Sequence, residues 1–360
     1  MTRTAIRRVA WLAVGVLLLA AGVYGSRVAS ILAAYKAKML CSEVFLAGRE
    51  ADVVERELEV DDLEPLRYIT DSVDRTGGRV TSRFAGIIAE DAAYHPNRGC
   101  AVWFTPQTVR DQSFRQTWFP GADLPESPDG RLRPVLDRAF AEPNPERPRR
   151  TRAVIVVRDG GIVAERYASG FTKDTPILGW SMTKTVINAL VGVLVKEGRL
   201  AVDRPVPIPE WQDAGDPRHV ITLDHLLRMS SGLEFDESPW NPVSDVTVML
   251  LGRPDAGFYA ASKGLAAVPG TTWKYSSGTT NIISRAIRTV INNDAVYADF
   301  PRQALFNRLQ MSSALIETDA SGAFIGSSFG YATARDWARL GMLYVNDGVW
   351  EGQRLSLIHI

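Results

Sequence analysis

An uncharged apolar stretch near the start of the chain limits where this protein can fold. Residues 9–25 read VAWLAVGVLLLAAGVYG and follow Arg3, Arg7 and Arg8. A helix of this composition is apolar on every side, which fits poorly with an ordinary core helix at the extreme N-terminus. Its length is short for a membrane span and long for a signal-peptide core. The stretch therefore predicts a membrane anchor or a signal segment within residues 1–36.

The residues that follow favour an uncleaved anchor over a cleaved signal, although both alternatives stay open. No small-residue A-x-A cleavage site comes after residue 25. Either alternative exports the bulk of the chain. Arg27, Lys36 and Lys38 lie beyond the stretch, so the charge asymmetry that orients a span is weak. We expect a single N-terminal span in the inner membrane, with the rest of the chain periplasmic or otherwise extracytoplasmic.

The charge balance argues against a nucleic-acid partner. Lysine and arginine number 41, aspartate and glutamate also number 41, and the formal net charge is zero. The sequence thus has neither the basic excess that binds phosphate backbones nor an acidic tail. Hydrophobic residues make up 46% and charged residues 23%, which is typical of a globular protein.

The chain contains two cysteines, Cys41 and Cys100. In an oxidising compartment these thiols can form a disulfide. Closing a loop of that length would stabilise the fold by about 4 kcal/mol in the chain-entropy estimate. The alternative is two unpaired buried thiols. Because the apolar stretch favours export, we expect the disulfide.

A proline-rich, charged segment divides the chain. Residues 142–152 read EPNPERPRRTR, which is typical of an exposed connection. We expect a domain boundary there, with an N-terminal extension at 37–150 and a second domain at 151–355. The extension gives no sign of its role, since its short apolar runs are separated by glycine, proline and aspartate.

The second domain has the clearest secondary-structure signals. Residues 153–168 are two apolar runs around an Asp-Gly-Gly turn, which predicts a β-hairpin. Residues 181–197 predict a helix that is buried on nearly all sides and stops at Gly198. A shorter helix is expected at 222–232, with Thr222 as its cap. Further helices are expected at 279–290 and 334–346. A hairpin followed by helices, without βαβ units, indicates the α+β class.

A serine and a lysine lie one turn apart at the start of the buried helix. In GWSMTKT, residues 179–185, Ser181 and Lys184 are three positions apart and share one helix face. A serine hydroxyl attacks a carbonyl only when a base removes its proton. Burial disfavours the ammonium form of a lysine, and a helix N-terminus stabilises developing negative charge. The pair is compatible with a nucleophile and its base, but taken alone it is more typical of a capping serine beside a snorkelling lysine.

A tyrosine farther along the chain can complete such a site. WKYSSG, residues 273–278, leads into the helix predicted at 279–290 and places Tyr275 two positions before Ser277. A phenol can relay a proton between the nucleophile and the leaving group. Taken alone, this motif is more typical of a tyrosine with a satisfied hydroxyl at the edge of a loop.

Three motifs in order resemble the serine β-lactamase and penicillin-binding-protein superfamily. They are SMTK (181–184), LLRMSSGL (226–233) and PGTTWKYSSGTTNIISRAI (269–287). The resemblance covers residues 150–354 and points to the class C-like esterase and 6-aminohexanoate-dimer hydrolase branch. It implies a β-lactamase-like fold, in which an antiparallel sheet is combined with a helical domain.

The resemblance also implies roles for individual residues. Ser181 would be the nucleophile that forms the acyl intermediate, and its backbone N–H would be half of the oxyanion hole. Lys184 would be its base partner, and Tyr275 would be the second acid/base. The substrate would be held by Trp180, Ser277 and Gly278. Neither a metal nor an organic cofactor is implied.

Two departures from the family's pattern bear on substrate and activity. Ser277 stands where β-lactamases carry an asparagine that contacts an acylamino side chain, which disfavours a β-lactam or peptidoglycan substrate. The family also carries a Lys- or His-containing triad on a late strand, in addition to the stretches named above. This triad does not occur before residue 360. We expect a truncated chain that lacks the last sheet strands and the C-terminal helix, with 356–360 as a foreign tail. The hairpin at 153–168 would then keep an unpaired edge strand. Whether a chain truncated in this way is catalytically active stays open.

Other hydrolase classes fit less well. An α/β-hydrolase needs G-x-S-x-G, but Thr183 stands where the second glycine should be. No H-E-x-x-H or Cys/His ligand spacing supports a zinc hydrolase. We therefore expect a serine hydrolase that cleaves a small ester or amide substrate. The alternatives are a β-lactamase or D-amino-acid peptidase proper, and a membrane-anchored protein that binds cell-wall peptides without cleaving them. The sequence gives no indication of oligomeric state.

Overall fold

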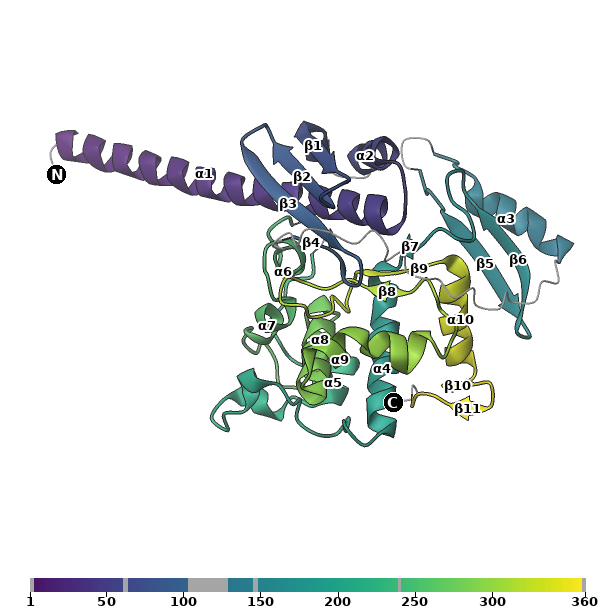
Figure 1. Cartoon of the computed structure of the whole chain (residues 1–360). Coiled ribbons are helices and arrows are strands. Elements are labelled where there is room, and N and C mark those ends of the chain that lie inside the picture. Colours follow the sequence, from purple (N-terminus) through teal and green to yellow (C-terminus); the bar gives the residue numbers. More distant parts are fainter. Residues whose placement is uncertain (1–2, 61–63, 103–128, 145–147, 239–240, 358–360) are drawn as a thin grey trace.

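The computed structural model describes residues 3–60, 64–102, 129–144, 148–238 and 241–357. In Figure 1 a long helix enters a small N-terminal unit, which lies against a larger unit rich in helices. Residues 145–147 of the predicted connection and residues 358–360 of the predicted tail fall outside the described ranges.

The N-terminal unit is an antiparallel sheet packed on a helix. Helix α1 (Arg3–Cys41) continues into a π-helical turn (Ser42–Leu46), which is followed by α2 (Ala51–Val60) and a 3₁₀ turn (Glu64–Tyr68). The strands lie in the order β1 (Ile69–Asp74), β2 (Arg79–Phe84), β3 (Ile88–His95) and β4 (Gly99–Val102). Each strand pairs antiparallel with the next.

Helix α1 has two halves in different surroundings. Residues 11–27 are exposed, whereas nearly all residues from Ala29 to Cys41 are buried or half-buried in the N-terminal unit. Within the described residues, this is the one helix that is long and apolar enough to cross a membrane. The apolar stretch at 9–25 is therefore helical, and the boundary predicted at residue 36 falls inside a continuous helix.

Two lysines that the sequence suggested as flanking charges are instead buried. Lys36 Nζ lies 2.8 Å from Asp71 Oδ2 and also contacts Glu59. Lys38 Nζ lies 2.5 Å from Glu317 Oε2, a carboxylate of the larger unit. Burial lowers the pKa of Lys38, and the Glu317 carboxylate opposes that shift.

The structure joins Cys41, at the end of α1, to Cys100 in β4 by a disulfide. The backbone N–H of Cys100 donates to Glu317 Oε1 over 2.6 Å. The disulfide therefore lies beside the buried Lys38–Glu317 pair, at the place where the two units meet.

The larger unit contains an antiparallel hairpin, a second small sheet and a group of helices. The hairpin of β5 (Ala153–Arg158) and β6 (Gly161–Tyr167) turns at Asp159 and Gly160, both with positive φ, as predicted. In the second sheet β9 (Gly330–Ala332) lies between β7 (Ile177–Leu178) and β8 (Leu315–Ile316). The remaining elements are α3 (Arg133–Phe140), α4 (Thr183–Lys196), α5 (Leu223–Leu227), α6 (Asp245–Leu251), α7 (Ala256–Ala261), α8 (Ser277–Ile291), α9 (Asp294–Pro301), α10 (Ala334–Val345), β10 (Val349–Trp350) and β11 (Gln353–Arg354).

Helix α4 lies at the centre of the larger unit, and its apolar side chains form much of the core. The helix predicted at 181–197 is confirmed, except that its first residues, Trp180–Met182, form a 3₁₀ turn. Thr222 caps α5 by accepting from the N–H of His225, as predicted. Antiparallel sheets combined with helices confirm the predicted α+β class. Residues 356–357, predicted as foreign, pack on α4, where the Ser356 hydroxyl donates to Ala189 O.

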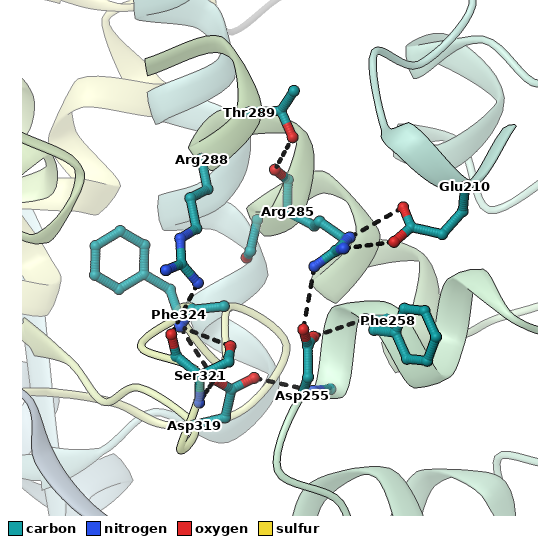
Figure 2. A network of polar contacts seen from close by, with 12 residues as sticks. Glu210, Asp255, Phe258, Arg285, Arg288, Thr289, Asp319, Ser321 and Phe324 are labelled. Carbon is teal, nitrogen blue, oxygen red and sulfur yellow. Dashed lines mark hydrogen bonds and ion pairs between the residues drawn. The ribbon is translucent and has the colours of Figure 1, made fainter. Parts of the chain in front are cut away.

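A network of charges fixes α8 to the loops around it (Figure 2). Arg285 of α8 donates to Glu210 and, over 3.1 Å, to Asp255 at the start of α7. The Asp319 carboxylate accepts from the N–H of Ala256 over 2.9 Å. Since α8 begins at Ser277, this network holds the helix whose first turn carries part of the predicted site.

The network makes stability depend on pH. Burial raises the pKa of Asp319 to about 6, whereas an unfolded aspartate titrates near pH 4. The folded state therefore holds the proton of Asp319 more tightly than the unfolded state does. As the pH rises from about 4 to about 6, this group should lower the free energy of unfolding by at most about 3 kcal/mol. Urea unfolding across that range should show the slope in the unaltered chain and lose it in Asp319→Asn. Asp299→Asn, at an exposed position, should keep it. Equal slopes in all three proteins would contradict the assignment.

Candidate active site

Ser181 lies at a tightly held junction between a strand and a helix. Strand β7 ends at Leu178, and the 3₁₀ turn at Trp180–Met182 leads into α4. The N–H of Gly179 donates to Gly330 O over 2.8 Å, and the N–H of Gly330 donates to the Thr183 hydroxyl over 2.9 Å. Trp180 has a φ of 44°, which is a strained value for a residue with a side chain. Strand β9 thus fixes both ends of the turn.

The three side chains predicted to be catalytic meet at this turn. Lys184 Nζ lies 3.1 Å from Ser181 Oγ, and the Tyr275 hydroxyl donates to the same Oγ over 2.8 Å. Lys184 Nζ also lies 5.0 Å from the centroid of the Tyr275 ring. Ser181 and Tyr275 are exposed and Lys184 is half-buried. A substrate can therefore reach the hydroxyl from solvent while the amine lies behind it.

Two further acceptors orient the Lys184 amine. Its Nζ lies 2.8 Å from the carbonyl oxygen of Ser327 and 3.2 Å from Ser277 Oγ. A lysine amine has three positions for a proton or a lone pair besides its carbon. Because these acceptors occupy two positions with N–H bonds, the third is directed at Ser181. A neutral amine held in this way would present its lone pair to the serine hydroxyl.

A glutamate that sequence reasoning missed supports this arrangement. Glu237 accepts from the N–H of Ser277 over 2.8 Å and from its hydroxyl over 2.5 Å. The Ser277 hydroxyl thus accepts from Lys184 and donates to Glu237, which connects the amine to a carboxylate. Glu237 lies in a loop of the LEFDESPW segment, where neither periodicity nor spacing marks it.

The two other residues predicted to hold substrate differ in their surroundings. Trp180 is exposed next to Ser181, and its ring lies 5.8 Å from that of Phe329. Gly278 is buried in the first turn of α8, and a Cβ there would lie 2.6 Å from the Phe235 ring. The structure thus gives Gly278 a packing constraint, whereas Trp180 is open to a ligand. Their assignment to substrate binding stays a prediction.

The described part of the chain contains no cluster of three His, Cys, Asp or Glu side chains that could hold a metal ion. The ring of His225 instead completes the cap of α5, where its Nδ1 accepts from the N–H of Thr222 over 3.2 Å. The groups that the site itself offers are an exposed hydroxyl, an amine, a phenol and a helix N-terminus.

Comparison with known proteins places this geometry in a family. The model of the Beta-lactamase family matches residues 136–357. The 6-aminohexanoate-dimer hydrolase of Paenarthrobacter ureafaciens is 28% identical over 218 residues, which cover 57% of this chain and 54% of the relative. A solved structure from Bacillus anthracis, provisionally called a 6-aminohexanoate-dimer hydrolase, superimposes with a TM-score of 0.55 at 21% identity. That match covers 66% of each chain. Because the match with the Paenarthrobacter ureafaciens hydrolase covers 54% of that protein, the chain spans about half the length of this curated relative.

The turn that carries Ser181 should not tolerate a side chain at Gly179. A Cβ there would lie 2.4 Å from Cζ2 of Trp337, whose indole N–H donates to Ile177 O. Gly179→Ala should cost about 1–3 kcal/mol of unfolding free energy through overpacking. Gly341→Ala on α10 meets open space and should stabilise by up to about 1 kcal/mol. Denaturant unfolding of both variants tests the contrast, and an unchanged stability of Gly179→Ala would refute it.

Proposed function

The chain belongs to the Beta-lactamase family, and from this premise we propose that the protein is a serine hydrolase that acts through an acyl intermediate on Ser181. The observation that carries the proposal is that an amine and a phenol both contact one exposed serine hydroxyl. The family and the relative named as a hydrolase support it from outside the site.

The proposed reaction begins when Lys184 takes the proton of Ser181. The serine oxygen forms a bond to the carbonyl carbon of the substrate, and the tetrahedral oxyanion is stabilised at the N-terminus of α4, with the N–H of Ser181 as one donor. The bond to the leaving oxygen or nitrogen then breaks. Tyr275 delivers a proton to that atom and regains one from the Lys184 ammonium. Water attacks the acyl-serine in the same way, and the acid product leaves.

The proposed substrate class is a small ester or a linear amide. One relative is named for hydrolysis of a 6-aminohexanoate dimer, a short linear amide, and we extend that class to this chain as a proposal. Ser277 supports it, because its hydroxyl is engaged by Lys184 and Glu237 and cannot replace the amide that β-lactamases direct at an acylamino side chain. β-Lactams and D-amino-acid peptides are thereby disfavoured.

We also propose that α1 anchors the protein in the inner membrane, with the hydrolase domain on the extracytoplasmic side. Two features support the anchor. The exposed apolar half of α1 continues without interruption into the buried half. A disulfide is typical of exported proteins.

The acyl-serine proposal predicts a single covalent adduct. Incubation with a fluorophosphonate, followed by peptide mass spectrometry, should place the adduct on Ser181. Ser181→Ala should abolish both labelling and turnover of a p-nitrophenyl ester, while Ser262→Ala, at an exposed serine of another element, should change neither. An adduct on another serine would overturn the assignment. Absence of both labelling and ester turnover would favour a protein that binds cell-wall peptides without cleaving them.

The contacts of Glu237 predict that it positions Ser277 and Lys184 without touching the substrate. In Glu237→Gln the amide nitrogen would donate to Ser277 Oγ and compete with Lys184 for that acceptor. We expect kcat to fall about 10- to 100-fold, the value of one charge-assisted hydrogen bond, with little change in KM. Asp236→Asn, which alters the adjacent carboxylate that binds Ser238 and Asn241, should leave kcat unchanged. A fall in thermal stability that fully accounts for lost activity would show a merely structural role.

A further inference from the structure

Helix α1 enters the folded domain without a linker. Residues 11–27 are exposed, Val28 is half-buried, and Ala29 is buried. A helix rises about 1.5 Å per residue, so the apolar stretch that ends at Gly25 lies within about 5 Å of the first residue packed in the domain. If α1 spans a bilayer, as proposed above, the domain surface around Val28 must lie at the lipid headgroups.

The orientation of the N-terminal sheet determines which loop lies at that surface. The ring of Tyr94, near the end of β3, stacks on Phe45 just beyond the C-terminal end of α1. Glu90, near the start of β3, accepts from the hydroxyl of Ser30, close to where α1 enters the domain. Strand β3 therefore runs from the exposed half of α1 toward its buried end. The turn that precedes β3 lies at the end where α1 emerges, as Figure 1 shows.

This turn is apolar and strongly exposed. Ile87 is 84% exposed and follows Ala85 and Gly86, both with positive φ. Tyr68 is 60% exposed, and its carbonyl accepts from the N–H of Ala85 over 3.1 Å, so it lies beside the turn. We refer to Tyr68 and residues 84–87 as the β2–β3 tip. A single exposed isoleucine is ordinary on a soluble protein, but here an isoleucine and a tyrosine lie together at the end from which an apolar helix projects.

Basic side chains accompany the apolar ones. Arg83 precedes the tip and Arg27 ends the exposed half of α1, and both are exposed. Neither forms an ion pair with another residue in the described ranges. Tyrosine and arginine are the residues that occupy the headgroup level of anionic membranes, with aliphatic side chains inserted below them.

We propose that the β2–β3 tip is a second membrane contact, which rests on the bilayer that α1 crosses. Ile87 enters the boundary between headgroups and acyl chains, the Tyr68 hydroxyl remains among the headgroups, and Arg83 binds lipid phosphates. The inference depends on the proposed anchoring by α1 but not on the hydrolase chemistry. One helix alone would leave the tilt of the domain against the bilayer free, and the tip restricts that tilt.

The test measures lipid contact at single positions of the full chain. The two native cysteines are joined in a disulfide, so an introduced cysteine can be labelled with an environment-sensitive fluorophore without reductant. The variants are Ile87→Cys, Leu17→Cys in the exposed half of α1, and Val345→Cys on α10, which is 86% exposed and thus matched to Ile87. Each is reconstituted in vesicles of phosphatidylcholine and phosphatidylglycerol, with and without lipids that carry a nitroxide quencher.

We expect the quencher to reduce fluorescence about twofold at positions 17 and 87, and to leave position 345 unchanged. Quenching at 17 without quenching at 87 would overturn the tip contact and leave the anchor in place. Absence of quenching at both would overturn the tip contact and the anchor together. Equal quenching at 87 and 345 would mean unspecific adsorption and refute the proposal. A blue shift at 87 without lipid quenching would indicate a protein partner and would likewise refute it.

Discussion

Gly330 accepts a hydrogen bond from Gly179 and donates one to Thr183, and these two bonds join the candidate site to the rest of the molecule. The segment that contains Gly330 also supplies the carbonyl of Ser327, which accepts from Lys184. On its other side, the Phe329 ring lies 4.1 Å from Lys38 Nζ, and the Tyr331 hydroxyl donates to Glu43 of the N-terminal unit. Residues 327–331 therefore contact the candidate site and the N-terminal unit at once.

This arrangement gives the N-terminal unit a structural role that its sequence does not reveal. It buries Glu317 and supplies the lysine that neutralises that carboxylate. Breaking one member of such a buried pair generally costs about 3–5 kcal/mol, because the other charge is left unpaired. The disulfide lies in the same place, and Cys100 contributes its own N–H to Glu317. Residues 327–331, which include the carbonyl that accepts from Lys184, thus pack against an N-terminal unit that is closed by a disulfide.

The sequence predicted those features whose signals are local. The Asp-Gly-Gly turn of the hairpin, the cap at Thr222 and the apolar circumference of α4 each depend on neighbouring residues. Ser181 and Lys184 share a helix face, so their proximity followed from spacing. Tyr275 was placed beside them only through the resemblance to a family, because its position depends on the packing of α8 against α4.

Other features depend on contacts between distant residues and were not predictable. Glu237 gains its place from a loop that crosses the start of α8, and no local pattern encodes that crossing. Lys36 and Lys38 were interpreted only as charges that flank the apolar stretch, and lysines are rarely buried. Their partners Asp71 and Glu317 lie far along the chain. A local pattern could therefore not reveal that both lysines form ion pairs in the interior.

The division of α1 has a consequence for proteolytic release. Peptide bonds between Tyr24 and Arg27 belong to exposed residues, and burial of α1 begins only at Val28. If α1 anchors the protein as proposed, cleavage there would release a form that keeps the buried residues of both units, the disulfide and the candidate serine site. Cleavage one or two turns later would remove residues on which the sheet packs, and the N-terminal unit would lose its fold. A few residues of α1 thus separate cleavage that would release the protein from cleavage that would unfold its N-terminal unit.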